Sequence, residues 1–456
     1  MNETTNPDRT SRSLRKVVSQ VLNQLGTSKE ARYYLNQFSA ADSMRFAVIK
    51  IGGAVLDEQL DLLAEALALL HDLGLMPILV HGAGPQLDRA LVDADIETVK
   101  RDGLRVTTPE VMEVVRPMVY RINRRLVHAL QKQGVMAQGI QHGVFQCEFL
   151  DESRYGLVGE VQKVDLEALR DVVQSGALPV VACLGENASG QVMNINADFA
   201  AREIVWQVRP HKIIFLTANG GLLDAVGRVI TAISLRNDLE YLRSQDWVHS
   251  GMLLKLDQIA QMLSKLPETA SVSITSVDNL ATELFTHRGA GTLVRQGEQV
   301  LVEDKIDASL IPELTDLLEN SFHRKMGSGF FDQDDLECLI RSESNGAIAI
   351  VRKGVNGLPY LDKFAVTPKA QGAGLGSSVW QTLIHRYPKL YWRSRTGNTL
   401  TRWYYEQADT HFSSEQWIAF SRGLTDMNEI EACRDDCFDR PESWLPRGPG
   451  RSGKSP

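Results

Sequence analysis

Short runs of consecutive apolar residues alternate with longer segments of helical periodicity from residue 46 to about residue 294. The apolar runs cover 46–51, 76–81, 178–184 and 212–216, and helix-length segments such as 58–73 and 109–133 lie between them. Continuous rather than alternating apolarity suits strands that are buried on both faces. The pattern therefore predicts an α/β domain, with a mainly parallel sheet sandwiched by helices.

A polar link at 295–299 interrupts this pattern, and shorter elements follow it. The predicted order is helix 309–319, strands 347–353 and 358–366, helix 375–386, strand 389–394, a further helix, and strand 415–420. This order indicates a second, smaller α+β domain. We predict domain limits of 41–300 and 301–446, with a disordered tail at 447–456 that is rich in Pro, Gly and Ser.

The N-terminal segment 1–40 is predicted to form a helical arm. Between Leu14 and Leu25 the apolar residues follow one another at steps of 3 and 1, which is typical of an amphipathic helix, and Gly26 is a candidate C-cap. The arm packs either on its own domain or on a neighbouring subunit. A cleaved transit peptide is the minor alternative, because Glu3 and Asp8 interrupt its basic residues.

Composition excludes several classes of protein. The 456 residues carry a net charge of −8, which argues against a nucleic-acid partner. The apolar runs are too short and too interrupted to span a membrane, and no apolar segment follows the polar start as in a signal peptide. The five cysteines are scattered without zinc-site spacing, so we expect reduced thiols, no bound metal and a cytoplasmic protein.

Two glycine turns each follow a predicted buried strand in the first domain: Gly52–Gly53, and Gly82 with Gly84. Backbone N–H groups at the carboxyl edge of an α/β sheet favour anions. Neither turn has the P-loop or dinucleotide-binding spacing. A plain tight turn is the alternative for each.

Polar residues near these turns strengthen the case for an anion site. Lys50 lies within an apolar strand, where its ammonium group needs an anion at the sheet edge. Asn194, Asn196 and Asp198 alternate into a helix, where the alternative role is an N-cap. Lys255 in an early helical turn is otherwise a surface lysine. Arg105 lies in a separate segment, DGLRVTT (102–108). It is either a carboxylate clamp or a solvated side chain.

Five ordered motifs resemble those of the amino-acid kinases, and more narrowly of the N-acetylglutamate kinases, over residues 45–297: KIGG (50–53), HGAGP (81–85), GLRVT (103–107), NINAD (194–198) and GMLLK (251–255). The resemblance implies that Lys50 and Lys255 stabilise the transferring phosphoryl group and that Asp198 holds both lysines. The same resemblance implies N–H groups for the phosphates at Gly52, Gly53, Gly82 and Gly84, and N-acetylglutamate ligands at Arg105, Asn194 and Asn196.

Residues 215–227, which include Gly220, are similar to the loop that lies on the nucleotide side in this family. The resemblance implies that Gly220 binds ATP. The family usually has glycine where this chain has Ala83, and the extra methyl group is expected to crowd the phosphate. The N-terminal arm resembles the extension of arginine-inhibited members, which implies a homo-oligomer and L-arginine as effector.

A third glycine turn, QGAGLG at 371–376, follows a predicted strand and opens a helix in the second domain. The pattern resembles the pyrophosphate-binding turn of the GCN5-type acetyltransferases, in which backbone amides bind coenzyme A. The turn residues that would bind acetyl-CoA are Gln371, Gly372, Gly374 and Gly376. A plain strand–helix turn is the alternative.

The flanking sequence resembles the acetyltransferase domain of animal-type N-acetylglutamate synthases over residues 310–445. It implies main-chain contacts to acetyl-CoA at Phe364, Ala365 and Val366, and glutamate ligands at Lys363, Arg393, Arg395 and Asn398. Tyr404 would be the general acid; alternatively it is a core aromatic residue. Arginine suits glutamate because it binds carboxylates bidentately. We assign no general base, and a water relay is an open alternative.

Together the resemblances imply a bifunctional N-acetylglutamate synthase/kinase that uses acetyl-CoA, L-glutamate and ATP with Mg²⁺. Acetylation of glutamate would supply the substrate that the first domain phosphorylates. The alternatives are a synthase whose kinase-like domain only senses arginine, a kinase whose second domain only binds coenzyme A or a partner, and a non-catalytic assembly. The presence of Lys50, Asp198 and Lys255 argues against the first.

Overall fold

The computed structural model describes residues 43–248, 250–267, 270–285, 290–332, 335–367, 370, 374–398 and 400–445. The chain divides into two units, residues 1–296 and 297–456, and this division falls within the predicted polar link. The predicted arm at 1–40 and the predicted tail at 447–456 lie outside the described residues.

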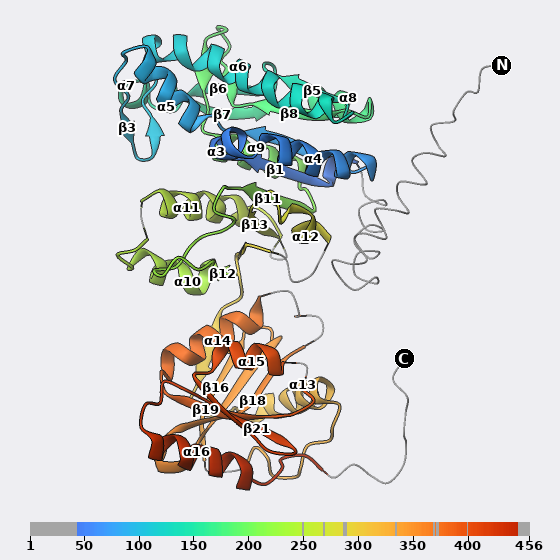
Figure 1. The fold of residues 1–456 in the computed structure, drawn as a ribbon, viewed down its shortest axis with the longest axis vertical. Helices are drawn as coiled ribbons and strands as arrows, with labels where there is room; N and C mark the ends of the chain where they lie inside the picture. The colour runs from blue at the N-terminus through green and yellow to red at the C-terminus, as the bar shows by residue number, and fades with distance from the viewer. Residues whose placement is uncertain are drawn as a thin grey trace, which may run out of the picture. The chain divides into compact units, whose positions relative to one another are not determined.

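An eight-stranded sheet forms the centre of the first unit, in the order β12-β14-β13-β11-β1-β2-β8-β5 (Figure 1). Its strands from β13 to β5 are parallel, and β14 is antiparallel to β13. The strands are β1 (Ala47–Ile51), β2 (Ile78–His81), β5 (Ala137–Ile140), β8 (Leu178–Ala182), β11 (Lys212–Leu216), β12 (Ala232–Ser234), β13 (Ser271–Thr275) and β14 (Thr292–Arg295). The predicted mainly parallel sheet is confirmed.

Helices cover both faces of this sheet because successive strand side chains point to opposite faces. Ile49 and Ile51 face the core under α3 (Gly53–Glu58), α4 (Leu60–Asp72), α5 (Gly84–Asp93), α6 (Pro109–Lys132) and α12 (Leu280–Phe285). Val48 and Val80 face the core under α8 (Leu166–Gln174), α9 (Ala197–Val208), α10 (Leu235–Arg243) and α11 (Ser250–Ser264). The predicted sandwich is therefore present.

A four-stranded sheet, in the order β10-β9-β6-β7, supplements the large sheet of the first unit. It consists of β6 (Phe145–Phe149), β7 (Gly159–Val164), β9 (Leu184–Glu186) and β10 (Val192–Asn194). A hairpin of β3 (Lys100–Arg101) and β4 (Leu104–Arg105) and the short helix α7 (Glu152–Tyr155) lie outside both sheets. The sequence pattern did not predict these small elements, whose runs are too short to show a period.

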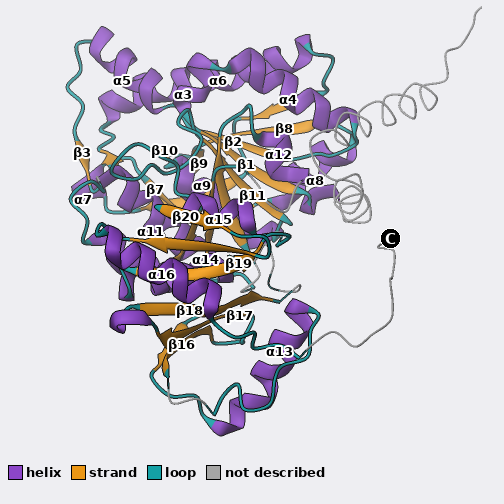
Figure 2. Ribbon diagram, turned by 60° about the horizontal axis from the view of Figure 1, so that its bottom comes forward, coloured by secondary structure: helices purple, strands orange, loops and turns teal. Residues whose placement is uncertain are grey.

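The second unit contains a seven-stranded sheet, in the order β15-β16-β17-β18-β19-β21-β20 (Figure 2). Only β18 and β19 are parallel neighbours in it. The strands are β15 (Val300–Glu303), β16 (Leu336–Ser342), β17 (Ala347–Lys353), β18 (Pro359–Val366), β19 (Leu390–Arg395), β20 (Thr410–Ser413) and β21 (Trp417–Arg422). This is the predicted α+β class.

Two layers of helices cover the second sheet. One face carries α14 (Leu375–Arg386) and α15 (Thr401–Gln407), which pack with Phe364 and Trp392. The other face carries α13 (Ile311–Phe322) against Ala365, and α16 (Met427–Asp439) against Tyr391. Among the described residues, no helix combines the length and the apolar character needed to cross a membrane. All five cysteines are buried as free thiols.

Candidate active sites

The two glycine turns of the first unit lie against each other at the ends of adjacent strands. β1 leads into α3 at Gly53, and β2 leads into α5 at Gly84. A Cβ atom at Gly53 would lie 2.7 Å from Pro85 Cδ and 2.8 Å from Gln86 Oε1, so only glycine fits where the turns meet. Gln86 Nε2 also donates to Gly53 O at 2.8 Å. The contact sets two helix N-termini together at the carboxyl edge of the sheet, where anions bind.

Two of the four predicted phosphate-binding amides are engaged in the protein itself. The N–H of Gly52 donates to the last carbonyl of β11 at 3.0 Å, and that of Gly82 to the last carbonyl of β1 at 2.9 Å. The structure differs here from the prediction, because these bonds extend the sheet. Gly53 and Gly84 are the first residues of their helices, and first-turn amides have no partner within the helix. The amides of Gly53 and Gly84 therefore have no partner within their own helices.

Ala83 fits the second turn without strain. Its φ of −142° lies in the region open to any L-residue, and its methyl group is buried in the apolar core together with Leu87. At the neighbouring Gly84, a Cβ atom would meet nothing within 4 Å. The methyl group of Ala83 is therefore packed in the core, whereas open space lies at Gly84.

Three charged side chains from different elements form one electrostatic site. Lys50 Nζ on β1 lies 2.7 Å from Asp198 Oδ1 in the first turn of α9, and these side chains are only 11% and 16% exposed. Burial, followed by the positive charge of Lys50, lowers the pKa of Lys255 on α11, while Asp198 opposes this effect. Asp198 thus pairs with Lys50 and acts electrostatically on Lys255, so two positive charges lie near one carboxylate.

The predicted substrate ligands Arg105 and Asn194 are joined through one segment. Arg105 ends the β3–β4 hairpin, and Asn194 Nδ2 donates to Thr107 Oγ1 at 3.1 Å, two residues further along. The Arg105 guanidinium lies 2.5 Å from Asp88 Oδ1 and also donates to Thr98. Arg105 is thus held in a buried site rather than solvated.

Asp88 is a partner that the sequence interpretation missed. It lies on α5, one turn after Gly84, and no local pattern links it to the hairpin. Burial pushes the pKa of Asp88 upward, but hydrogen bonds from Arg105 and Lys100 outweigh this effect and hold it below its ordinary value. A carboxylate that already binds Arg105 orients the guanidinium that was predicted to bind substrate.

Asn196 and Gly220 have clear local roles. Asn196 Oδ1 caps α9 by accepting from the N–H groups of Asp198 at 2.8 Å and Phe199 at 3.4 Å, so the N-cap alternative describes its contacts here. The cap fixes the first turn, which carries Asp198. Gly220 has a φ of +70°, which favours glycine, in the turn that follows β11.

The parallel strands β18 and β19 of the second unit separate along their length. They pair only at Tyr360–Tyr391 and Leu361–Trp392. Residues 363–366 of β18 continue to pair with β17 on the other side. In an antiparallel pair the main-chain groups of alternate residues point away from the partner strand. The segment Phe364–Val366, predicted to contact acetyl-CoA, therefore presents main-chain groups to a gap in the sheet.

The third glycine turn meets this gap. Gly374, with a φ of +76°, precedes α14, and a Cβ atom at Gly376 would lie 2.8 Å from Val366 Cγ2. The close approach brings the N-terminus of α14 to the end of β18, so helix amides and strand main chain face one place. Gln371 and Gly372, also predicted to bind acetyl-CoA, lie outside the described residues.

Tyr404 on α15 is enclosed by aromatic rings. Its ring centroid lies 5.3 Å from that of Trp403 and 5.7 Å from those of Trp392 and Phe420. Burial raises the pKa of Tyr404, which keeps the hydroxyl protonated at neutral pH. Tyr404 is thus a core aromatic residue with a protonated hydroxyl.

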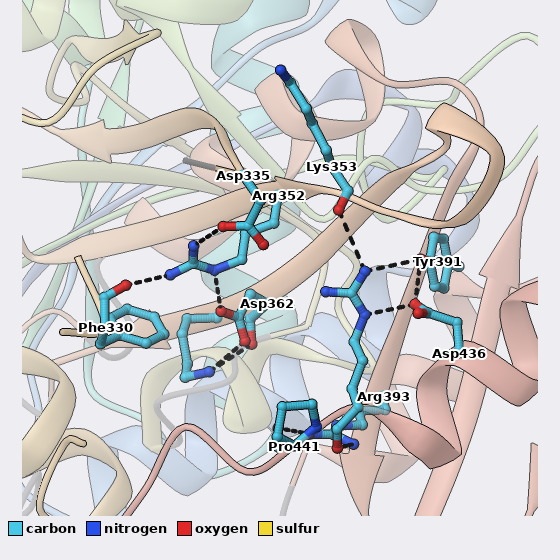
Figure 3. A network of polar contacts seen from close by, with 11 residues as sticks. Phe330, Asp335, Arg352, Lys353, Asp362, Tyr391, Arg393, Asp436 and Pro441 are labelled. Carbon is cyan, nitrogen blue, oxygen red and sulfur yellow. Dashed lines mark hydrogen bonds and ion pairs between the residues drawn. The ribbon is translucent and has the colours of Figure 1, made fainter. Parts of the chain in front are cut away.

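Lys363 belongs to a buried ion cluster on the other face of the second sheet. Figure 3 shows Asp362 and Arg352 of this cluster. Lys363 Nζ lies 2.5 Å from Asp362 Oδ1, and Arg352 Nε lies 2.6 Å from Asp362 Oδ2. Burial lowers the pKa of Lys363, and the charge of Asp362 opposes this effect. The ammonium also lies 4.9 Å from the centre of the Phe330 ring. The lysine is held by protein groups on the side of α13.

Arg393 and Arg395 alternate along β19 and point to the same face of the strand. Their guanidinium carbons lie 4.2 and 4.8 Å from the centre of the Trp417 ring. Arg393 also donates to carbonyl oxygens at and beyond the C-terminal end of α16, and Figure 3 shows the bond to Pro441. The acceptors are Cys437, Arg440 and Pro441, at 2.8, 2.7 and 2.8 Å. Arg393 therefore caps a helix, a role that the glutamate-binding prediction did not include.

Glu442 was not foreseen from the sequence. Its carboxylate bonds Arg395 and lies 2.9 Å from Arg324 Nη2. Asn398, the remaining predicted glutamate ligand, donates to Ser394 Oγ at 2.9 Å. Arg395, which was predicted to bind the substrate glutamate, is thus paired with Glu442 of the protein itself.

Residues predicted to act on acetyl-CoA, the acetyl donor, lie on one face of the second sheet. Residues predicted to bind glutamate, the acetyl acceptor, lie on the other face. Phe364 and Tyr404 pack under α14 and α15. Lys363 contacts Phe330, which packs with α13, and Arg393 contacts the end of α16. The gap between β18 and β19 begins beyond Leu361 and Trp392, where the two strands stop pairing.

Comparison with known proteins connects both sites to families. Residues 45–274 match the amino acid kinase family, and residues 301–440 match the N-acetyltransferase of N-acetylglutamate synthase. The acetylglutamate kinase of Xanthomonas campestris is 44% identical over 92% of this chain and 100% of that protein. The mitochondrial N-acetylglutamate synthase of Homo sapiens is 30% identical over 93% of this chain and 78% of that protein.

A solved structure has the same succession of folds. N-acetylglutamate synthase from Neisseria gonorrhoeae, complexed with coenzyme A and N-acetyl-glutamate, matches with a TM-score of 0.55 and 19% identity, over 86% of this chain and 98% of that chain. The predicted resemblance is confirmed in both parts of the sequence. The chain belongs to the amino acid kinase family and carries, after its kinase-type domain, an N-acetyltransferase domain of the N-acetylglutamate synthase type.

Proposed function

We propose that the chain catalyses two reactions of arginine biosynthesis: acetyl transfer from acetyl-CoA to L-glutamate, and ATP-dependent phosphorylation of the N-acetyl-L-glutamate formed. The ion pair of Lys50 with Asp198, next to Lys255, carries the proposal. A domain retained only to sense arginine does not need a buried lysine paired with a carboxylate and a second, partly buried lysine near them. The relatives named acetylglutamate kinase and N-acetylglutamate synthase each align over more than nine-tenths of the chain, which supports both activities.

In the kinase step, a side-chain carboxylate oxygen of N-acetylglutamate attacks the γ-phosphorus of ATP, and ADP leaves. Such transfers need in-line positioning and neutralisation of charge. Lys50 and Lys255 would neutralise the phosphoryl oxygens, and the amides of Gly53 and Gly84 would hold phosphates. Arg105 would bind a substrate carboxylate. The magnesium ion would enter with ATP, since the described residues contain no cluster of three or more His, Cys, Asp or Glu suited to a metal.

In the acetyl-transfer step, the deprotonated amine of glutamate attacks the thioester carbonyl carbon, and the carbon–sulfur bond breaks. The departing sulfur takes a proton, which we assign to the hydroxyl of Tyr404. The nitrogen loses one proton as the amide forms, and an equivalent proton returns to the Tyr404 oxygen. The free main-chain groups of β18 would orient the acetyl and pantetheine portions. Lys363, Arg395 and Asn398 would bind the acceptor, and the base stays unassigned.

Two assays on one purified sample test the proposal. One follows thiol release from acetyl-CoA and glutamate, and the other follows ADP release from Mg-ATP and N-acetylglutamate. We expect both to be positive and L-arginine to lower at least one rate. A structure of the Neisseria gonorrhoeae synthase has been solved with coenzyme A and L-arginine, which motivates the titration. Thiol release alone would favour the synthase-only alternative, and two flat titrations would rule out arginine as effector.

Replacement of Glu442 with alanine is expected to lower the KM for glutamate about twofold to fivefold. The carboxylate competes with substrate for Arg395, and a partly exposed ion pair contributes about 0–1 kcal/mol. Steady-state acetyl transfer at varied glutamate measures the change. Glu431→Ala is the matched control, because Glu431 pairs with Arg434 on α16. A rise in KM would instead make Glu442 the residue that orients Arg395 for substrate.

A further inference from the structure

One face of α9 continues from the site of Asp198 along the helix. Asp198, Arg202 and Trp206 follow one another at intervals of four residues and so lie on the same side of α9. Helix α11, which carries Lys255, packs against α9. We call Asp198, Arg202 and Trp206 the α9 stripe. Its side chains can therefore fix the position of α11.

Hydrogen bonds from side chains of the α9 stripe connect α9 with α11. Arg202 Nη1 donates to Gln258 Oε1 at 3.1 Å and to Gln261 Oε1 at 2.7 Å. One turn further along α9, Trp206 Nε1 donates to Met262 O at 2.9 Å. Gln258 is buried and lies three residues after Lys255, so the bond from Arg202 reaches the helical turn next to the lysine.

The guanidinium of Arg202 is itself held in place. Its Nη2 lies 2.8 Å from Glu203 Oε1, and both side chains are 14% exposed. The guanidinium carbon also lies 4.9 Å from the centre of the Phe199 ring and 4.8 Å from that of Trp206. A planar guanidinium fixed by an ion pair and two rings can define the position of its two glutamine partners.

The position of Lys255 needs such support. Lys50 and Lys255 carry like charges that repel each other, and burial also disfavours the ammonium form of Lys255. Asp198 offsets only part of this, because its carboxylate is already paired with Lys50 at 2.7 Å. Contacts elsewhere on α11 must therefore hold the lysine beside the other two charges.

We propose that Arg202 is a positioning residue for the phosphoryl-transfer site, which holds Lys255 in place through Gln258 and Gln261. The proposal rests on the kinase activity proposed above. Arg202 does not contact substrate in this role. It acts by fixing α11 against α9, so its loss displaces Lys255 without removing a charge from the site.

The test compares Arg202→Ala and Arg202→Lys with Arg243→Ala. Arg243 is the matched control because it pairs with Asp257 on α11 from α10, at 2.7 Å and half exposed. We expect kcat for phosphorylation to fall about tenfold to 100-fold in Arg202→Ala with KM values within about twofold, since misplaced catalytic groups cost rate more than binding. Arg202→Lys is expected to fall less. Arg243→Ala is expected to have the same kcat and KM values for phosphorylation as the protein without substitutions.

A second readout does not need turnover. An amine-acylating reagent labels unprotonated lysine, so the labelling rate of Lys255 against pH, measured by peptide mapping, reports its environment. Arg202→Ala is expected to move this profile toward higher pH, as the lysine leaves its buried site. An unchanged profile together with a kcat equal to that of Arg243→Ala would overturn the positioning role. If the protein without substitutions lacks kinase activity, the proposed function fails. If Arg202→Ala still shifts the pH profile of Lys255 labelling, the inference that Arg202 holds Lys255 in place stands.

Discussion

Lys50→Ala is expected to reduce ATP-dependent phosphorylation of N-acetylglutamate by about 100-fold to 1,000-fold and to leave acetyl transfer largely intact. The substitution removes a cation from the transferring phosphoryl group, and loss of one electrostatic partner of a transition state typically costs about 100-fold to 1,000-fold. It also leaves the carboxylate of Asp198 buried without its partner at 2.7 Å. Breaking a buried pair in this way destabilises by about 3–5 kcal/mol, so the folded fraction must be measured as well.

ADP release and thiol release from the same sample provide the measurement, with a thermal melt to report folding. Lys163→Ala is a suitable control because that lysine is exposed on β7 of the same unit. If both activities disappear in a folded Lys50→Ala protein, the two units depend on each other for catalysis. Unchanged phosphorylation would remove Lys50 from the proposed site.

Tyr404→Phe is expected to lower kcat for acetyl transfer by about 100-fold to 1,000-fold, which lies within the range for loss of a positioned general acid. The KM for acetyl-CoA is expected to change little. Phenylalanine keeps the ring that packs against Trp392 and Phe420 and removes only the hydroxyl. The neighbouring Tyr405→Phe is the control, because Tyr405 is 40% exposed and packs against His411.

The pH dependence gives an independent check on Tyr404. Burial raises the pKa of its hydroxyl, so the protonated acid persists as pH rises through 10.0, the ordinary value for tyrosine. Acetyl transfer is therefore expected to show no decline from loss of this proton between about pH 7 and pH 10. Rates equal in Tyr404→Phe and Tyr405→Phe would exclude Tyr404 as the acid and leave it as a core residue.

Local patterns predicted the elements with long, regular apolar spacing. The strand predicted at 212–216 is β11 with the same limits, and the helix predicted at 375–386 is α14. Helix 109–133 is α6 within one residue at its end. In contrast, β9 and β10 have three residues each, too few to show a period, and they become strands by pairing with each other.

The candidate sites show the same division. The motifs pointed to Lys50, Asp198 and Lys255 because buried charge and glycine turns are visible in one dimension. The partners Asp88, Arg202 and Glu442 were missed, because an aspartate, arginine or glutamate in a helix or loop has no distinguishing local pattern. The capping role of Arg393 was not foreseen because α16, whose end it caps, was not among the predicted elements.

The sequence by itself determined the class of each domain and the chemical groups of each site, because apolar periodicity, glycine turns and charged motifs act over a few neighbouring residues. Only the tertiary structure decided which groups meet. It occupied the amides of Gly52 and Gly82 with strand carbonyls, paired Arg105 with Asp88, and separated β18 from β19 near Gly374 and Gly376. These outcomes depend on packing between segments that lie far apart along the chain, where a hydrogen bond or ion pair forms only after the sheets and helices have come together.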